Sequence, residues 1–197
     1  MQKIFFTFLF VLLWFIPSVS AQAEADDIRE MLEARDQEIK ELLGPSGTDY
    51  TQEQRDQLKD IINGVINYQS MAEYALGDTY DEISDEEREE FVSLFSTIIR
   101  DNSLNRLDIY RAEVTYDNIE VNGDSAFVET TATLEDVRTS VDYDLALMNE
   151  AWMVTDIGID EVSTADSYQR QFQSIIRQRG FDALMESLRR RAARSST

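Results

Sequence analysis

The stretch AWMVTDIGIDEVSTADSYQRQF, Ala151 to Phe172, decides the fold of this chain. It begins as an apolar strand led by Trp152 and ends as the start of a helix that carries aromatic side chains. It also holds four carboxylates, at Asp156, Asp160, Glu161 and Asp166. Either these carboxylates form an active site, or the stretch forms one wall of an apolar container whose rim is charged.

Upstream of this stretch, the apolar residues alternate with polar ones, which is typical of half-buried strands. Residues 113–121 and 125–134 flank Asn122-Gly123-Asp124, and we expect a hairpin there because Asn-Gly supplies the positive φ angles of a tight turn. Residues 139–148 and a turn at Asn149-Glu150 lead into the opening stretch. Four consecutive strands with short connections predict an antiparallel meander that has one face to cover.

Helical periodicity predicts the elements that cover this face. A first helix over residues 24–43 ends at Gly44-Pro45, and capping boxes mark the starts of two later helices. The boxes pair Thr51 with Gln54 and Ser84 with Glu87. The remaining predicted helices are a short one over residues 68–77 that stops at Gly77, one through Tyr168 and Ile176, and a last one after Gly180. Together the patterns predict one α+β domain with a four-stranded antiparallel sheet covered by several helices.

The residue types exclude several kinds of chemistry. The chain of 197 residues contains no histidine and no cysteine, which removes histidine- and cysteine-based nucleophile systems, imidazole and thiolate metal sites, and disulfides. It carries 18 basic and 39 acidic residues, and its formal net charge is −21. Because nucleic-acid binding needs clustered positive charge, we expect no nucleic acid as a partner.

The carboxylates allow two enzymatic interpretations, and each has a simpler alternative. A pair of carboxylates could serve a glycosidase, although so acidic a chain contains adjacent pairs by chance. Asp156 is a candidate general base, or it caps a turn or pairs with an arginine. The segment from Asp117 fails as a calcium-binding EF-hand loop because its third and fifth positions are Ile119 and Val121. We expect no catalytic residues and no metal site.

The N-terminal residues 1–23 have the anatomy of a secretory signal peptide. Lys3 supplies the positive charge, residues 4–16 form an apolar run that is short for a membrane-spanning helix, and cleavage is expected after Ala21 or Ala23. We therefore expect an exported protein whose single domain spans residues 24–197.

The apolar stripes leave one question open. Phe91, Leu94, Phe95, Ile98 and Ile99 recur at helical spacing, which is typical of a helix that buries one face. Such periodicity cannot distinguish a filled core from the lining of a cavity.

From Tyr68 onward the chain resembles the MlaC family of periplasmic phospholipid carriers, also called the toluene-tolerance family. The resemblance rests on four segments in the family's order: MAEYALGDTY (71–80), SDEEREEFVSLFSTII (84–99), AWMVTDIGIDEVS (151–163) and SYQRQFQSIIRQRGFDALMESL (167–188). The chain departs from the family pattern at Glu161, at Gln169 and around Asn102 and Ser103, and these departures concern headgroup contacts more than the fold.

The resemblance implies that a curved sheet and its helices enclose an apolar cavity for the acyl tails of a phospholipid, which is cargo and not a cofactor. It implies two partners, an outer-membrane lipoprotein-porin complex and an inner-membrane ABC transporter whose ring consists of MCE proteins. The lipid-binding residues that it implies are Met71, Tyr74, Leu76, Phe91, Phe95, Ile98, Ile99, Val128, Val141, Tyr143, Leu145, Trp152, Val154, Tyr168, Phe172, Ile175 and Ile176. An enzyme of similar shape and an adaptor that binds no lipid remain as alternatives.

One local charge reversal stands out in this acidic chain. The arginines Arg177, Arg179, Arg189, Arg190, Arg191 and Arg194 gather near the C-terminus. We expect them to contact an acidic partner surface or the lipid phosphate, and the alternative is that they stabilise helix C-termini.

Overall fold

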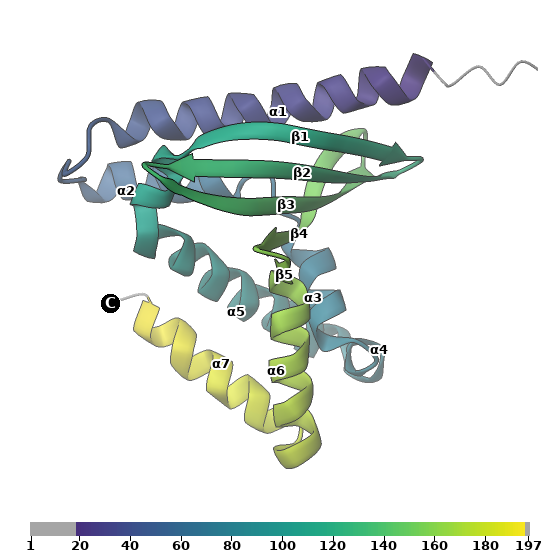
Figure 1. The fold of residues 1–197 in the computed structure, drawn as a ribbon. Helices are drawn as coiled ribbons and strands as arrows, with labels where there is room; N and C mark the ends of the chain where they lie inside the picture. The colour runs from purple at the N-terminus through teal and green to yellow at the C-terminus, as the bar shows by residue number, and fades with distance from the viewer. Residues whose placement is uncertain (1–18, 196–197) are drawn as a thin grey trace, which may run out of the picture.

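The computed structural model describes the backbone of residues 19–195, and their side chains apart from those of residues 19, 20, 105, 106, 108 and 195. Helices come first and last along the chain, and the strands lie between them (Figure 1). The helices are α1 (Val19–Leu43), α2 (Gln52–Asn63), α3 (Tyr68–Leu76), α4 (Thr79–Glu82), α5 (Asp85–Ser103), the 3-10 helix η1 (Leu104–Arg111), α6 (Thr164–Arg179) and α7 (Phe181–Ser195). The strands are β1 (Glu113–Asn122), β2 (Ser125–Leu134), β3 (Val137–Met148), β4 (Ala151–Ile159) and β5 (Val162–Ser163).

The sheet confirms the predicted α+β class and the antiparallel meander. Its order β1-β2-β3-β4-β5 follows the chain, and every neighbouring pair is antiparallel. The fifth strand was not predicted, and it exists because Asp160 and Glu161 both take positive φ angles and turn the chain back on β4. The expected role of Asn122 in the first hairpin was wrong. Asn122 is the last residue of β1, and the positive φ of +61° falls on Gly123.

The helix boundaries follow the local patterns in the sequence. Both predicted capping boxes are present, at the starts of α2 and α5. Gly77 and Gly180 end α3 and α6 with positive φ angles, which glycine adopts without steric cost. The first helix begins at Val19 and not at residue 24, so it includes both expected cleavage positions. Residues 1–18 of the predicted signal peptide lie outside the described residues.

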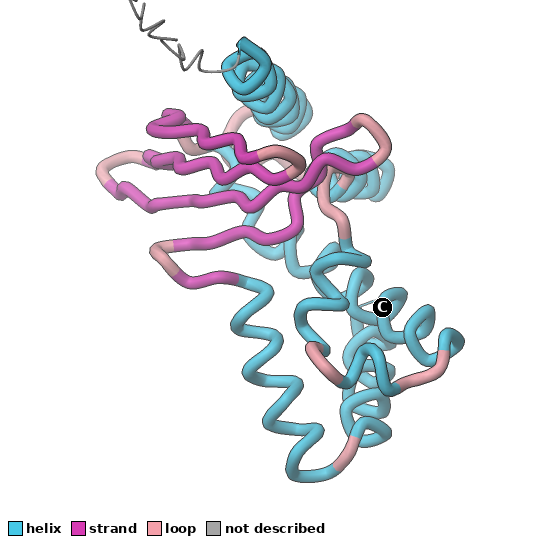
Figure 2. The backbone as a smooth tube through the Cα atoms, turned by 90° about the vertical axis from the view of Figure 1, so that its right-hand side faces the viewer, coloured by secondary structure: helices cyan, strands magenta, loops and turns pink. Residues whose placement is uncertain are grey.

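Two hydrophobic clusters hold these elements together. The larger one joins the sheet to α3, α5, α6 and α7, which pack together below the sheet in Figure 1. A smaller cluster around Ile39, Leu43 and Leu58 joins the end of α1 to α2 and η1. In both views α1 runs alongside β1, and it is the element that reaches both clusters (Figures 1 and 2). Within residues 19–195, no helix has the length and the apolar character needed to cross a membrane.

Candidate apolar binding site

The strand register arranges the apolar side chains of the sheet in rows on one face, which we call the inner face. Because side chains alternate along a strand, residues paired in register point to the same side. The first row consists of Val121, Ala126, Leu145 and Val154, the second of Ile119, Val128, Tyr143 and Ile157, and the third of Tyr116, Thr130, Val141, Ile159 and Val162. Beyond them, Leu134 pairs with Val137 at the end of the β2–β3 hairpin.

Exposure rises along β3 and β4 of the inner face, whereas β2 stays buried, with Val128 at 0% and Thr130 at 2%. In the first row Ala126, Leu145 and Val154 are buried. In the second row Tyr143 and Ile157 are half-buried, and in the third Ile159 and Val162 are 46% and 55% exposed. Val137, beyond the third row, is 65% exposed. We call the accessible part of this face, from Tyr143 and Ile157 to Val137, the open end.

The segment before α3 and two helices cover the first row at β4. The segment before α3 pairs with β4, where Val154 N donates to Val65 O at 2.7 Å and Asn67 N donates to Val154 O at 2.8 Å. Helices α3 and α6 then pack against β4. The apolar residues of the open end therefore form an accessible surface that is continuous with the core, and a ligand can contact them without unfolding the protein.

The helical layer below the sheet is closed by aromatic packing. Phe91 and Phe95 stack with ring centroids 5.7 Å apart, and Phe172 meets both rings edge to face at 5.7 and 5.8 Å. Tyr168 adds an edge contact to Phe95 at 5.1 Å. Since Phe91, Phe95 and Phe172 are buried, these side chains fill the space between α5 and α6.

The residues that the resemblance implied as a lipid-binding set fall into three groups. Nine are buried in the larger cluster: Met71, Leu76, Phe91, Phe95, Ile98, Val128, Leu145, Val154 and Phe172. Six are partly buried against it: Ile99, Tyr143, Trp152, Tyr168, Ile175 and Ile176. Val141 is half-buried at the open end, and Tyr74 is 51% exposed with its hydroxyl donating to Asp166. Their contact with a lipid stays a prediction.

The sequence reasoning missed part of the open end. Tyr116, Ile157, Ile159 and Val162 belong to the same rows as the predicted residues but were not included in the lipid-binding set. Their period-two alternation was visible in the sequence. What the sequence did not show is which end of the face the helices leave uncovered.

The carboxylates of the opening stretch mostly have structural roles. Asp156 Oδ1 accepts hydrogen bonds from Ile157 N at 2.8 Å and Ala165 N at 2.9 Å, and its Oδ2 accepts from the Ser163 hydroxyl. These bonds fix the start of α6 because the β4–β5 turn returns Ser163 beside Gly158. Of the roles considered for Asp156, the capping alternative is confirmed, and its carboxylate is not part of a solvated rim. Two other acids of the stretch also accept hydrogen bonds, Asp160 Oδ1 from Ser140 N at 3.2 Å and Asp166 Oδ1 from the Tyr74 hydroxyl.

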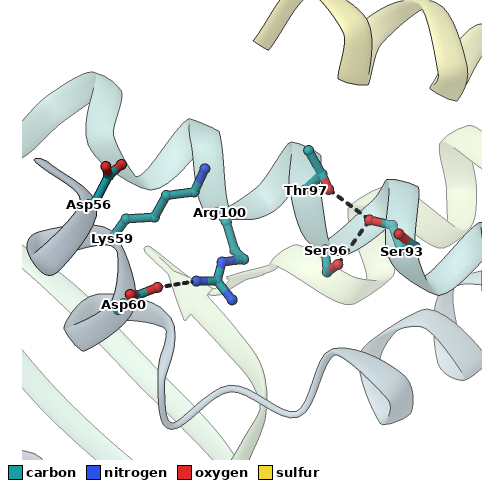
Figure 3. Close-up of a pocket in the computed structure, with 7 residues that line it drawn as sticks. All are labelled: Asp56, Lys59, Asp60, Ser93, Ser96, Thr97 and Arg100. Atoms are coloured by element: carbon teal, nitrogen blue, oxygen red, sulfur yellow. Dashed lines mark hydrogen bonds and ion pairs between the residues drawn. The ribbon is translucent and has the colours of Figure 1, made fainter. Parts of the chain in front are cut away.

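A polar hollow of about 430 Å³ lies between α2 and α5, away from the inner face (Figure 3). Its lining consists of Asp56, Lys59, Asp60, Ser93, Ser96, Thr97 and Arg100. Arg100 pairs with Asp60, and Lys59 pairs with Asp101. The hollow offers charged and hydroxyl groups and no apolar lining for an acyl tail. Among residues 19–195, no group of three or more acids is arranged to hold a metal ion.

The protein is an α+β domain in which one end of an apolar sheet face is accessible. This arrangement is typical of proteins that bind an apolar ligand. The family model described as MlaC protein matches residues 29–190, and the chain belongs to this family. The family predicted from the sequence is thereby confirmed.

A solved structure shares the fold. It is that of a phospholipid-binding protein from Ralstonia solanacearum in complex with a phospholipid, with a TM-score of 0.70 and 19% sequence identity over 86% of this chain and 97% of that chain. A comparison with curated protein sequences finds no match.

Proposed function

We propose that this protein binds a phospholipid by its acyl tails at the open end of the inner face and carries it between membranes. Membership in the MlaC family supports this function, and so does the fold shared with a phospholipid-binding protein. The observation that carries the proposal is the rise in exposure along two strands of the inner face, from Leu145 at 2% to Val137 at 65% on β3 and from Val154 at 1% to Ile159 at 46% on β4. An apolar surface that continues from the core to exposed positions offers acyl tails a place to bind.

Physical chemistry explains why such a surface is useful. Two acyl tails contain about 30 methylenes, and exposing them to water costs on the order of 24 kcal/mol at about 0.8 kcal/mol each. A phospholipid therefore needs a dry surface to cross an aqueous space. Because the carrier must also release its cargo, apolar contacts without a covalent step suit the task, and the protein acts as a binding protein and not as an enzyme.

The finer proposal concerns where the cargo goes. The predicted signal peptide exports the protein to the periplasm, where it takes phospholipid from or delivers it to an outer-membrane lipoprotein-porin complex and an inner-membrane ABC transporter with an MCE-protein ring. This exchange maintains the lipid asymmetry of the outer membrane. Its test is transfer of a labelled phospholipid from the loaded protein to each reconstituted complex, with no transfer to either as the contradicting result.

Binding itself is tested first. The exported full chain is purified, extracted with organic solvent and analysed by mass spectrometry, and native mass spectrometry is repeated after incubation with phospholipid vesicles. We expect a bound diacyl phospholipid in both measurements. Protein that stays lipid-free after incubation would leave an adaptor without a lipid site as the better interpretation.

A pair of variants connects binding to the inner face. Val141→Asp places a carboxylate at the open end, and Phe127→Asp places one on the opposite face of the sheet, where Phe127 is 37% exposed. Because a charge against acyl tails is costly, Val141→Asp should lower lipid occupancy by about tenfold or more. Phe127→Asp should leave occupancy unchanged. Equal losses in the two variants would show that the tails do not lie on the inner face.

A further inference from the structure

Two tyrosines, Tyr143 and Tyr116, lie on the inner face at the open end, and a third, Tyr110, acts electrostatically on Tyr143 from the smaller cluster. Tyr143 lies on β3, Tyr116 on β1 and Tyr110 on η1, and all are half-buried. Among the described residues, none of the three hydroxyls has a hydrogen-bond partner, whereas Tyr50, Tyr68, Tyr74 and Tyr80 all have one. The remaining tyrosine, Tyr168, also has none, but its ring packs against Phe95 and Phe172 in the helical layer. A half-buried hydroxyl without a partner is unfavourable and tends to be satisfied by water or a ligand.

These hydroxyls face accessible space. In the described part of the chain, Asp101 Oδ2 is the one sealed side-chain oxygen without a partner, so the three phenol oxygens are not sealed. Burial nevertheless raises the pKa of Tyr143 and of Tyr110 to about 12, so both phenols remain protonated donors at neutral pH. The tyrosine hydroxyls are therefore partly desolvated by the protein and still accessible to a ligand.

The order of side chains across the sheet matches the order of groups in a phospholipid. In the third row, Ile159 on β4 and Val141 on β3 are apolar, and Thr130 on β2 and Tyr116 on β1 carry hydroxyls. The guanidinium of Arg29 on α1 lies over the Tyr116 ring, 5.1 Å from its centroid. From β4 to α1 the surface therefore changes from apolar to hydroxyl to charged, as a lipid changes from tail to ester to phosphate.

The buried apolar residues of helix α1 are interrupted by a charged residue next to Tyr116 and Tyr143. Ile28 and Leu32 belong to the larger cluster, and Ile39 and Leu43 belong to the smaller one. Between them lies Asp36, which acts electrostatically on Tyr143 and Tyr116 and accepts from Lys40 Nζ at 2.6 Å. A charged pair thus occupies the α1 face next to the tyrosines, where a closed core would place another apolar side chain.

We propose that Tyr143, Tyr116 and Tyr110 form the polar end of the phospholipid site, where their hydroxyls donate hydrogen bonds to acceptor oxygens at the junction of tails and headgroup. This inference rests on the proposed function. The acceptors are ester carbonyl oxygens or phosphate oxygens. Both are strong acceptors for a phenol, and both lie between the tails and the charged end of the headgroup.

The test uses two lipids that differ only in the ester carbonyls. Lipid-free protein is incubated with vesicles of phosphatidylethanolamine in its diester form or in its diether form, and occupancy is titrated by native mass spectrometry. The variants are Tyr143→Phe, Tyr116→Phe and Tyr50→Phe. Tyr50 serves as the control because its hydroxyl donates to Leu43 O at 2.9 Å and accepts from Arg111 at 2.7 Å.

We expect Tyr143→Phe and Tyr116→Phe each to weaken lipid binding by about three- to tenfold, the usual effect of one hydrogen bond. A loss confined to the diester lipid identifies the ester carbonyl as the acceptor, and an equal loss for both lipids identifies the phosphate oxygen. The melting temperature of the lipid-free Tyr143→Phe protein should not fall, because the hydroxyl has no protein partner. Tyr50→Phe should lower the melting temperature and leave binding unchanged.

Wild-type binding of both lipids by Tyr143→Phe and Tyr116→Phe would overturn this inference while leaving the proposed function intact. A wild-type protein that takes up neither lipid would overturn both.

Discussion

The helical layer and the open end of the sheet are built from the same kinds of side chain, yet one is closed and the other is accessible. In the helical layer, Phe91, Phe95 and Phe172 contact one another and are buried. At the open end, Tyr143 and Ile157 are half-buried and Val162 is 55% exposed. Apolar composition alone therefore does not decide which region becomes core.

The difference comes from what can cover each surface. Helices α3, α5, α6 and α7 cover one another because each has neighbours on its apolar side. The inner face is broad, and α3 and α6 cover it at β4, while α1 runs alongside β1. Because the helices cover only part of the inner face, some of its apolar side chains stay accessible. These side chains form the open end.

The largest expected effect tests whether the helical layer is a filled core. Phe95→Ala should lower the free energy of unfolding of the lipid-free protein by about 3–5 kcal/mol, because the buried ring leaves a cavity. Urea denaturation followed by circular dichroism measures this change. Phe127→Ala on the outer face is the matched control and should change stability by about 0.5 kcal/mol or less. A similarly small effect for Phe95→Ala would mean that the ring borders open space.

A second pair of variants compares neighbouring rows of the inner face. Val128 is 0% exposed and Val141 is half-buried. Val128→Trp should destabilise the lipid-free protein by about 1–3 kcal/mol through overpacking. Val141→Trp should cost about 0.5 kcal/mol or less and should lower phospholipid occupancy, because the indole takes space that the tails need. The measurements are thermal unfolding of lipid-free protein and native mass spectrometry after incubation with vesicles.

The opposite pattern, a stable Val128→Trp and an unstable Val141→Trp, would show that the second row is open and the third closed, and would move the site to Val128 on β2.

Much of the fold was predictable because its causes are local. The capping residues Thr51 and Ser84 mark helix starts through hydrogen bonds within one turn, and both are present. The alternation along the strands fixed which side chains share a face. By contrast, β5 depends on positive φ angles at Asp160 and Glu161, which these residue types adopt less readily than glycine or asparagine.

The candidate site was less predictable because it depends on contacts between distant segments. Phe95 and Tyr143 both lie on apolar stripes, and only tertiary packing makes the first a core residue and leaves the second accessible. The unused hydroxyl of Tyr116 likewise follows from where α1 lies, which no local pattern encodes. The arginine cluster is a third case. Arg189 is bound to Glu90 and Arg190 to Glu186, so a role in docking stays a prediction beside these structural contacts.

The smallest expected effect concerns the edge of the helical layer, where α7 is tied to α5. Arg189 donates to both carboxylate oxygens of Glu90 at 2.6 Å, and these bonds hold the pKa of Glu90 below its ordinary value. A lowered carboxyl pKa contributes stability that is present above the ordinary pKa and is lost as pH falls through the lowered one. Glu90→Gln should therefore melt slightly below the wild-type protein at neutral pH, and the difference should vanish in acid.

Glu89→Gln is the control for this last change. Glu89 is an exposed neighbour of Glu90, and its substitution removes the same charge without breaking the bonds between Glu90 and Arg189. If the two variants had the same pH dependence, the cause would be the relief of general repulsion in a chain with a net charge of −21, and not the ion pair. Neither variant should alter phospholipid occupancy, since the α5–α7 contact lies in the closed region. A loss of lipid binding in Glu90→Gln would show that the helical layer and the open end are coupled, and that the closed region also takes part in holding the lipid.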